Sequence, residues 1–228
     1  MTRNSSATHS YTLDRGLRAL SILAVNPDGL TVSELAAELD THRAAVYRLL
    51  GPLADHRLIR REDNGRLVLG AGLVTLAAAV GQRLVDVSEP VLRELSERLG
   101  ATTALTIRDG DEGVVARVVV PRAHDVHLTY RQGMRHPLTS GAPGHALLAT
   151  APRHEDEPDF VTRARDCGYA ISRGQLLPGA TGVAAAIQGP THEPDAALSA
   201  VWIEGIDPED AARAVLAAAA EIGGRLSA

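Results

Sequence analysis

The spacing of apolar residues near the start of the chain predicts three helices joined by short turns. Leucines recur at helical spacing over residues 11–24, and the Asn-Pro-Asp-Gly segment at 26–29 ends that helix. Thr31 followed by Glu34 is a capping-box pattern, which predicts the start of a second helix. After a two-residue turn, helical spacing continues from about 42 to 56. Two short helices, a brief turn and a longer third helix are the layout of a helix-turn-helix.

A β-hairpin is predicted directly after the third helix. Residues 58–61 and 66–69 alternate as strands do, and Asn64-Gly65 between them is the strongest short signal for a hairpin. Such a hairpin is a wing, and its arginines suit contact with phosphate or the minor groove. The exposed face of the third helix also carries arginines, which bind guanine edges or phosphate, although a solvated face is the simpler reading. The candidate contacts to duplex DNA are Thr31, Ser33, Arg43, Ala44, Tyr47, Arg48, Arg60, Arg61 and Arg66.

The next segment is apolar on almost all sides. Residues 73–85 predict one helix with Gly81 inside it, and a helix of this kind must be buried. A second subunit is the favoured partner, and packing within the chain is the alternative. A further helix is predicted to open at Ser88-Glu89-Pro90 and to end at Gly100.

From residue 101 the pattern changes to strands interrupted by helices. Acidic residues and a proline at 207–210 mark the start of a last helix. The result is a mixed α/β chain whose second part is an α+β sensor domain. The predicted strands are 102–109, 114–120, 127–132, 169–172, 182–188 and 197–203, and the predicted helices are 143–150 and 160–167. The predicted domains are 11–70, a linker or dimerisation helix at 71–86, and 87–228.

Charge and composition narrow the classes of function. The net charge of the 228 residues is −5, but residues 1–70 carry nine arginines against eight acids, and all 23 basic residues are Arg. Nucleic-acid binding depends on the local face rather than on the total charge. A single cysteine, no apolar run of about 18 residues and no leader-like start predict a cytoplasmic protein with no membrane partner.

Several segments resemble the IclR family of bacterial transcription regulators. They include YTLDRGLRALSILA, LTVSELAAELDTHRAAVYRLLGPLADHRLIRR and GMRHPLTSGAPGHALLA, and the resemblance covers about residues 11–227. It implies a GAF-like effector domain, a homodimer or homotetramer, repression more often than activation, and a small organic effector. A dimeric winged helix in turn predicts a near-palindromic operator.

The chain departs from the family pattern at two places. Ala44-Ala45 stands where the family usually has Ser-Thr, which shifts DNA contact to Arg43, Tyr47 and Arg48, and His42 stands where a proline is common. The connection at 151–159 is shorter than usual in the family, and we expect a solvated acidic loop there.

The resemblance also implies an effector pocket. Members that bind small α-keto acids are similar but carry Asp near Ser172, Cys at Gly182 and Ser at Val201. We therefore expect a larger, more apolar acid, its carboxylate at the backbone N–H groups of 142–144. A closed pocket is the alternative. The implied pocket residues are Ala142, Pro143, Gly144, Ser172, Gly182, Ser199 and Val201.

The sequence gives less support to an enzymatic function. His124, His127, His136 and His145 have no Cys or Glu partner at ligand spacing, so no metal site is predicted. The segment 140–145 lacks the G-x-S-x-G pattern, and we predict neither catalytic residues nor a cofactor. The alternatives that remain are a small-molecule-binding enzyme with an incidental winged domain, and a protein–protein adaptor.

Overall fold

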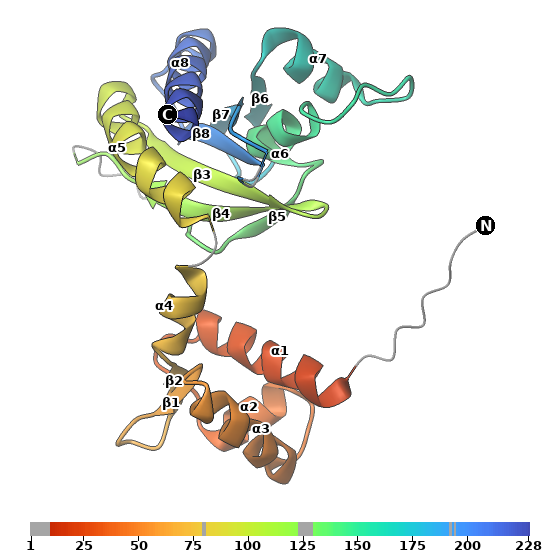
Figure 1. The fold of residues 1–228 in the computed structure, drawn as a ribbon, viewed down its shortest axis with the longest axis vertical. Helices are drawn as coiled ribbons and strands as arrows, with labels where there is room; N and C mark the ends of the chain where they lie inside the picture. Colours follow the sequence, from red (N-terminus) through yellow and green to blue (C-terminus); the bar gives the residue numbers. More distant parts are fainter. Residues whose placement is uncertain (1–9, 79–80, 123–129, 192, 194) are drawn as a thin grey trace. The chain divides into compact units, whose positions relative to one another are not determined.

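The computed structural model describes residues 10–78, 81–122, 130–191, 193 and 195–228. Contacts divide the chain into two units, Met1–Val80 and Gly81–Ala228, and each is described by itself (Figure 1).

The first unit has three helices and a two-stranded wing, followed by a short fourth helix, which confirms the predicted helix-turn-helix. Its core joins all three helices to the wing, with Leu35, Val46 and Leu67 almost fully buried. Strands β1 and β2 pair antiparallel, Ile59 opposite Leu69. The elements are α1 (Tyr11–Val25), α2 (Val32–Glu38), α3 (Arg43–Asp55), β1 (Ile59–Arg61), β2 (Leu67–Leu69) and α4 (Gly72–Ala77).

The single helix predicted over 73–85 is wrong. Helix α4 ends at Ala77, and Gly81 adopts a left-handed conformation (φ 57°) that begins α5, Gln82–Leu99. Glycine reaches this conformation at no steric cost. Pro90 lies inside α5 instead of opening it. The lost backbone hydrogen bond is outweighed because the face around Leu92 and its apolar neighbours is buried.

The second unit is built on one six-stranded antiparallel sheet of order β5-β4-β3-β8-β7-β6. Helices α5 and α8 pack on one face through a large apolar cluster, and α6 and α7 belong to a separate cluster on the other face (Figure 1). The further elements are β3 (Thr102–Asp109), β4 (Glu112–Val119), β5 (Arg135–Pro137), α6 (Gly141–Leu148), α7 (Asp159–Cys167), β6 (Ala170–Arg173), β7 (Thr181–Ile187), β8 (Ala196–Trp202) and α8 (Pro208–Ser227).

One predicted strand of this sheet is misplaced. Of the segment 127–132, residues 127–129 lie outside the described residues, and the rest is not a strand. The edge strand is β5, where Arg135 pairs with Val114 of β4.

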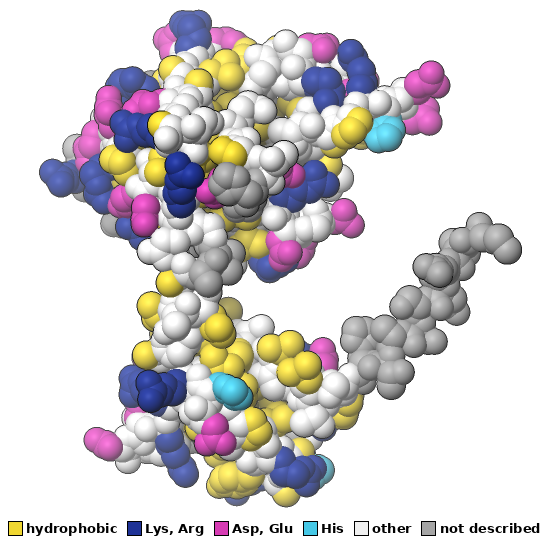
Figure 2. Space-filling model, in the orientation of Figure 1, with side chains coloured by type: hydrophobic (Ala, Val, Ile, Leu, Met, Phe, Trp, Pro, Cys, Tyr) yellow, Lys and Arg dark blue, Asp and Glu magenta, His cyan; other side chains and the backbone are white. Residues whose placement is uncertain are grey.

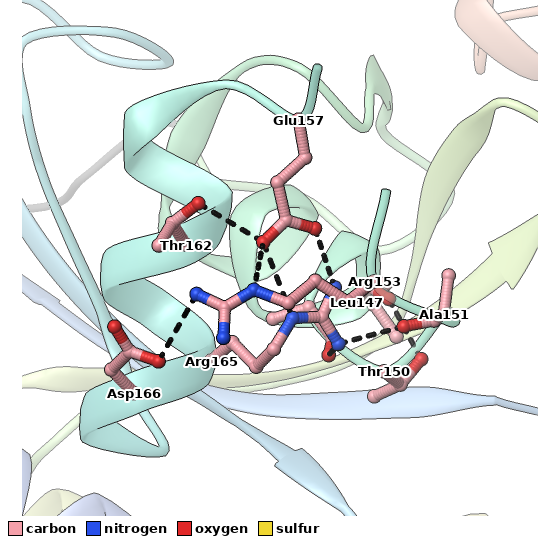
Figure 3. Close-up of polar contacts among 9 residues, drawn as sticks. Leu147, Thr150, Ala151, Arg153, Glu157, Thr162, Arg165 and Asp166 are labelled. Carbon is pink, nitrogen blue, oxygen red and sulfur yellow. Dashed lines mark hydrogen bonds and ion pairs between the residues drawn. The ribbon is translucent and has the colours of Figure 1, made fainter. Parts of the chain in front are cut away.

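The short connection between α6 and α7 is anchored, and not simply solvated as expected. The Glu157 side chain is only 8% exposed and pairs with Arg165 at 2.8 Å (Figure 3). Arg165 also donates to the carbonyl oxygens of Ala149 and Ala151, near the end of α6. The Thr162 hydroxyl donates to the same carboxylate at 3.0 Å. These bonds fix the last turn of α7, and the segment before the helix, against the end of α6.

Candidate nucleic-acid interface and ligand pocket

The exposed face of α3 carries the residues expected there. Arg43, Ala44, Tyr47 and Arg48 are all exposed, whereas Val46 on the opposite face is fully buried. In the described part of the chain, Arg43 and Arg48 have no ion-pair partner. Their guanidinium groups are therefore available to an external anion.

Two of the three arginines of the wing form polar contacts within the hairpin. Arg60 pairs with Glu62 at 3.0 Å, and Arg61 Nε donates to the Gly65 carbonyl at 3.2 Å. Both side chains are exposed on the hairpin.

The third arginine, Arg66, links the wing to the start of α2. Its Nε donates to the carbonyl oxygens of Asp28 and Gly29 at 3.1 and 3.0 Å. Its Nη2 lies 3.1 Å from a carboxylate oxygen of Glu34. These acceptors engage the Nε and Nη2 atoms of the guanidinium group. Arg66 therefore stabilises the contact between the wing and α2, whatever else it contacts.

The start of α2 is the capping box expected from the sequence. The Glu34 amide donates to the Thr31 hydroxyl at 3.2 Å, and the Thr31 amide donates to the Glu34 carboxylate at 2.7 Å. The bond from the Thr31 amide lowers the pKa of Glu34, with help from the Thr31 side chain and Arg66. Ser33 in the first turn is half-buried.

Four of the seven expected pocket residues line one small cavity: Pro143, Ser172, Gly182 and Val201. Ala142, Gly144 and Ser199 are buried but do not line it. The cavity measures about 20 Å³. That volume holds about one water molecule, so the pocket is closed in this conformation.

The first turn of α6 is already bonded by side chains of β6 and of the β6–β7 connection. The Gly141 amide donates to Gln175 Oε1 at 2.7 Å, and the Ala142 amide donates to Ser172 Oγ at 2.9 Å. Pro143 has no N–H. Of the amides expected to receive a carboxylate, that of Ala142 is thus engaged and Pro143 has none, and the Gly141 amide, one position earlier, is also bonded.

The two glycines assigned to the pocket have different surroundings. A Cβ on Gly144 would lie 2.3 Å from the Leu138 carbonyl oxygen, so this glycine permits close packing of α6. A Cβ on Gly182 would meet Ser172 Oγ at 3.4 Å and Val201 at 3.9 Å, inside the cavity wall.

Sequence reasoning missed the residues that fill the pocket. Tyr130, Gln175, Leu176 and Leu177 line the cavity, and Leu176 lies against Gly141. The available signal was an apolar Leu-Leu pair within the turn-rich segment 174–179. Apolar residues in a surface turn indicate a segment that packs inward.

Buried polar groups lie on the same side of the sheet. Tyr130 Oη, Thr106 Oγ1 and His136 Nε2 have no hydrogen-bond partner among the described residues. Burial raises the pKa of Tyr130 and lowers that of His136, so both groups are held neutral. The described residues contain no cluster of three metal-ligating side chains, and His124 and His127 lie outside them. No helix in the described ranges is long and apolar enough to cross a membrane.

A winged helix-turn-helix followed by an α/β domain of this topology is the architecture of a class of bacterial transcription regulators. Residues 12–63 match the IclR helix-turn-helix domain, and residues 76–159 match the bacterial transcriptional regulator IclR C-terminal domain. Together these matches cover more than half of the chain, which belongs to the IclR family.

Individual relatives agree with this assignment. The HTH-type transcriptional regulator Rv1719 of Mycobacterium tuberculosis is 34% identical over 139 residues, 60% of this chain and 53% of that protein. The HTH-type transcriptional repressor AllR of Escherichia coli K12 is 24% identical over 212 residues, 82% of this chain and 78% of that protein. The chain spans about half the length of the first curated relatives it matches. All of these relatives are named as transcription regulators, which does not favour the enzyme alternative.

Solved structures share the fold. An IclR homolog from Microbacterium hydrocarbonoxydans, complexed with 4-hydroxybenzoate, has a TM-score of 0.80 at 22% identity and covers 94% of this chain and 98% of that one. An IclR regulator from Alicyclobacillus acidocaldarius has a TM-score of 0.77 at 21% identity and covers 95% and 98% of the two chains.

Proposed function

We propose that this protein represses transcription by binding duplex DNA, and that a small organic acid controls its affinity for DNA. The observation that carries the DNA-binding part is the exposed face of α3, where Arg43, Tyr47 and Arg48 reach the surface and neither arginine has an ion-pair partner among the described residues. The wing adds Arg60 and Arg61 for phosphate contact. Relatives named as repressors support the direction of regulation.

The protein acts as a homodimer or as a homotetramer of such dimers. Helix α4 buries none of its residues within the described chain, and Val74 and Leu76 are 71% and 59% exposed. Helix α1 also exposes Tyr11, Leu13 and Leu17. Figure 2 shows hydrophobic side chains at the surface of this unit. Apolar surface of this kind is covered in a stable assembly, and a two-fold dimer would present two recognition helices to a near-palindromic operator.

Footprinting on the DNA upstream of the protein's own gene tests this function. We expect two protected half-sites related by a two-fold axis, about one helical turn apart or a multiple of that spacing. Protection of a single half-site would contradict the dimer. No protection on any upstream fragment, with no salt-dependent binding, would contradict DNA binding itself.

The effector binds where Gln175 now contacts α6. A carboxylate would replace the Gln175 carbonyl oxygen at the Gly141 amide, and the apolar body would displace Leu176 and lie over Gly182 and Val201. The relative crystallised with 4-hydroxybenzoate supports a ligand of this class. Because the cavity holds about one water molecule, binding requires the segment 174–179 to move.

A thermal-shift screen tests the effector class. Aromatic and branched acids should stabilise the protein and release DNA, whereas glyoxylate and pyruvate should do neither. Gly182→Leu should abolish the release of DNA by aromatic acids, because its side chain fills the cavity beside α6. Stabilisation by glyoxylate alone would contradict the apolar pocket, and unchanged release of DNA by aromatic acids in Gly182→Leu would contradict its location.

A further inference from the structure

A second, larger cavity lies on the outer side of α6, between α7, β6 and the start of α8. Its volume is about 370 Å³, and it shares no lining residue with the small cavity beside the first turn of α6. Sites for small organic molecules measure roughly 300–1,000 Å³. The cavity is therefore large enough for a ligand without any rearrangement.

Two arginines give this cavity a positive charge. Arg163 comes from α7 and Arg173 from the end of β6, and both are exposed. In the described ranges neither has an ion-pair partner, whereas the neighbouring Arg165 is fully engaged by Glu157. The acidic group in the cavity, Glu209, already accepts a hydrogen bond from the Tyr169 hydroxyl at 2.5 Å. No ion pair joins Glu209 to either arginine in the described part of the chain, so two guanidinium groups outnumber one carboxylate and can attract an external anion.

An apolar wall lies beside these charges. The rings of His145 and Phe160 lie 4.1 Å apart between centroids and are tilted by 32°. His145 is buried, its Nε2 lies 3.1 Å from the Thr139 carbonyl oxygen, and burial lowers its pKa, so the ring is neutral. Ala164 and Ile171 extend the apolar surface. A planar apolar body fits such a wall because aromatic rings stack favourably on one another.

The position of the wall and of one arginine is fixed by the anchored connection described above. Arg165, paired with Glu157, holds α7 against the end of α6 (Figure 3), and Phe160 and Arg163 lie on that same helix. The arrangement is therefore set before any ligand arrives, which reduces the ordering cost of binding.

We propose that this cavity is a second ligand site, which binds an organic anion with a planar apolar body. Arg163 and Arg173 bind the anionic group, and the His145–Phe160 pair receives the ring. The site is distinct from the pocket beside Gly182, and its occupancy does not depend on the proposed DNA binding.

Direct titration with 2-naphthoate, followed by its fluorescence, tests the site on the full chain. Arg163→Ala and Arg173→Ala should each weaken binding about fivefold, the upper range for exposed charge pairs. Arg98→Ala is the matched control, because it removes an exposed arginine of α5 that has no ion-pair partner among the described residues and should leave binding unchanged. The neutral 2-naphthamide should bind at least about fivefold more weakly than the acid.

The chain's single cysteine reports the location independently. Cys167 is exposed and lines this cavity, so saturating 2-naphthoate should slow its alkylation by iodoacetamide. Protection should persist in Gly182→Leu, which alters only the other pocket. This readout needs no DNA, so it remains informative if the proposed regulatory function fails.

Three results would overturn the proposal. They are unchanged 2-naphthoate affinity in the Arg163→Ala/Arg173→Ala double variant, full-rate alkylation of Cys167 at saturation, and loss of protection in Gly182→Leu. If the double variant fails to fold, the alkylation of the unmodified protein still decides between the outcomes.

Discussion

Replacing Arg66 by alanine should destabilise the DNA-binding unit rather than weaken its contact with DNA. The Arg66 Nε–H is shared between the carbonyl oxygens of Asp28 and Gly29, so it counts as one charge-assisted hydrogen bond. Such a bond contributes about 1.5–3 kcal/mol. The side chain is 33% exposed, so we take the lower end, about 1.5 kcal/mol. The ion pair with Glu34 is exposed and adds little.

Hydrogen exchange of the full chain measures this loss. A change of 1.5 kcal/mol should speed exchange of peptides from α2 and the wing about tenfold. Peptides from Gly81–Ala228 serve as an internal control. The domain should still fold, because backbone bonds between Leu30 and Leu67, at 3.0 and 2.7 Å, also tie the wing to the start of α2.

The matched variant is Arg61→Ala, on the same hairpin. It should leave exchange nearly unchanged and flatten the dependence of DNA affinity on salt by about one phosphate contact. In Arg66→Ala the dependence of DNA affinity on salt should be the same as in the original protein. Unaltered exchange in Arg66→Ala together with a flatter salt slope would refute this division of roles.

Three further outcomes are expected. Arg43→Ala should cost about 1–3 kcal/mol on the operator and relax its sequence preference, as measured by gel shift with base-substituted sites, and an equal loss on all sequences would contradict base contact. Gly144→Ala should destabilise the second unit by about 3 kcal/mol in urea, because its Cβ would collide with the Leu138 carbonyl oxygen, and a wild-type midpoint would contradict this. The hydrogen bond from Arg165 lowers the pKa of Glu157, so that pair's stabilisation is present above the unfolded carboxyl pKa and is lost as pH falls through the folded one. Glu157→Gln should therefore be less stable than the original protein at pH 7 and match it well below about pH 4, and a gap that persists in acid would contradict the pairing.

Local patterns were sufficient to predict most elements of this fold. The capping box at Thr31 and the Asn64-Gly65 turn identify a helix start and a hairpin from a few neighbouring residues. The linker was misjudged because apolar periodicity does not show that Gly81 adopts a left-handed conformation. Pro90 was expected to open a helix because proline prefers the first turn. It lies inside α5 instead, because burial of that helix outweighs this local preference.

The sites were harder to predict than the elements. That Arg66 faces back toward Asp28 and Glu34 depends on contacts more than thirty positions away in sequence. The closure of the pocket likewise depends on Gln175 reaching Gly141 across the domain. No local pattern contains this information, whereas the exposed face of α3 follows directly from helical periodicity.

The two edges of the six-stranded sheet have a consequence for self-association. Strand β5 spans only three residues and ends in Pro137, which has no backbone N–H, and β6 is bounded by left-handed Gly168 and Gly174. Short edges of this kind give another chain little backbone to pair with, so fibre-like growth by strand addition is discouraged. Copies of this chain should therefore assemble through helices rather than through strand edges. The exposed apolar side chains of α1 and α4 offer a partner no unpaired backbone groups, so they do not promote strand addition.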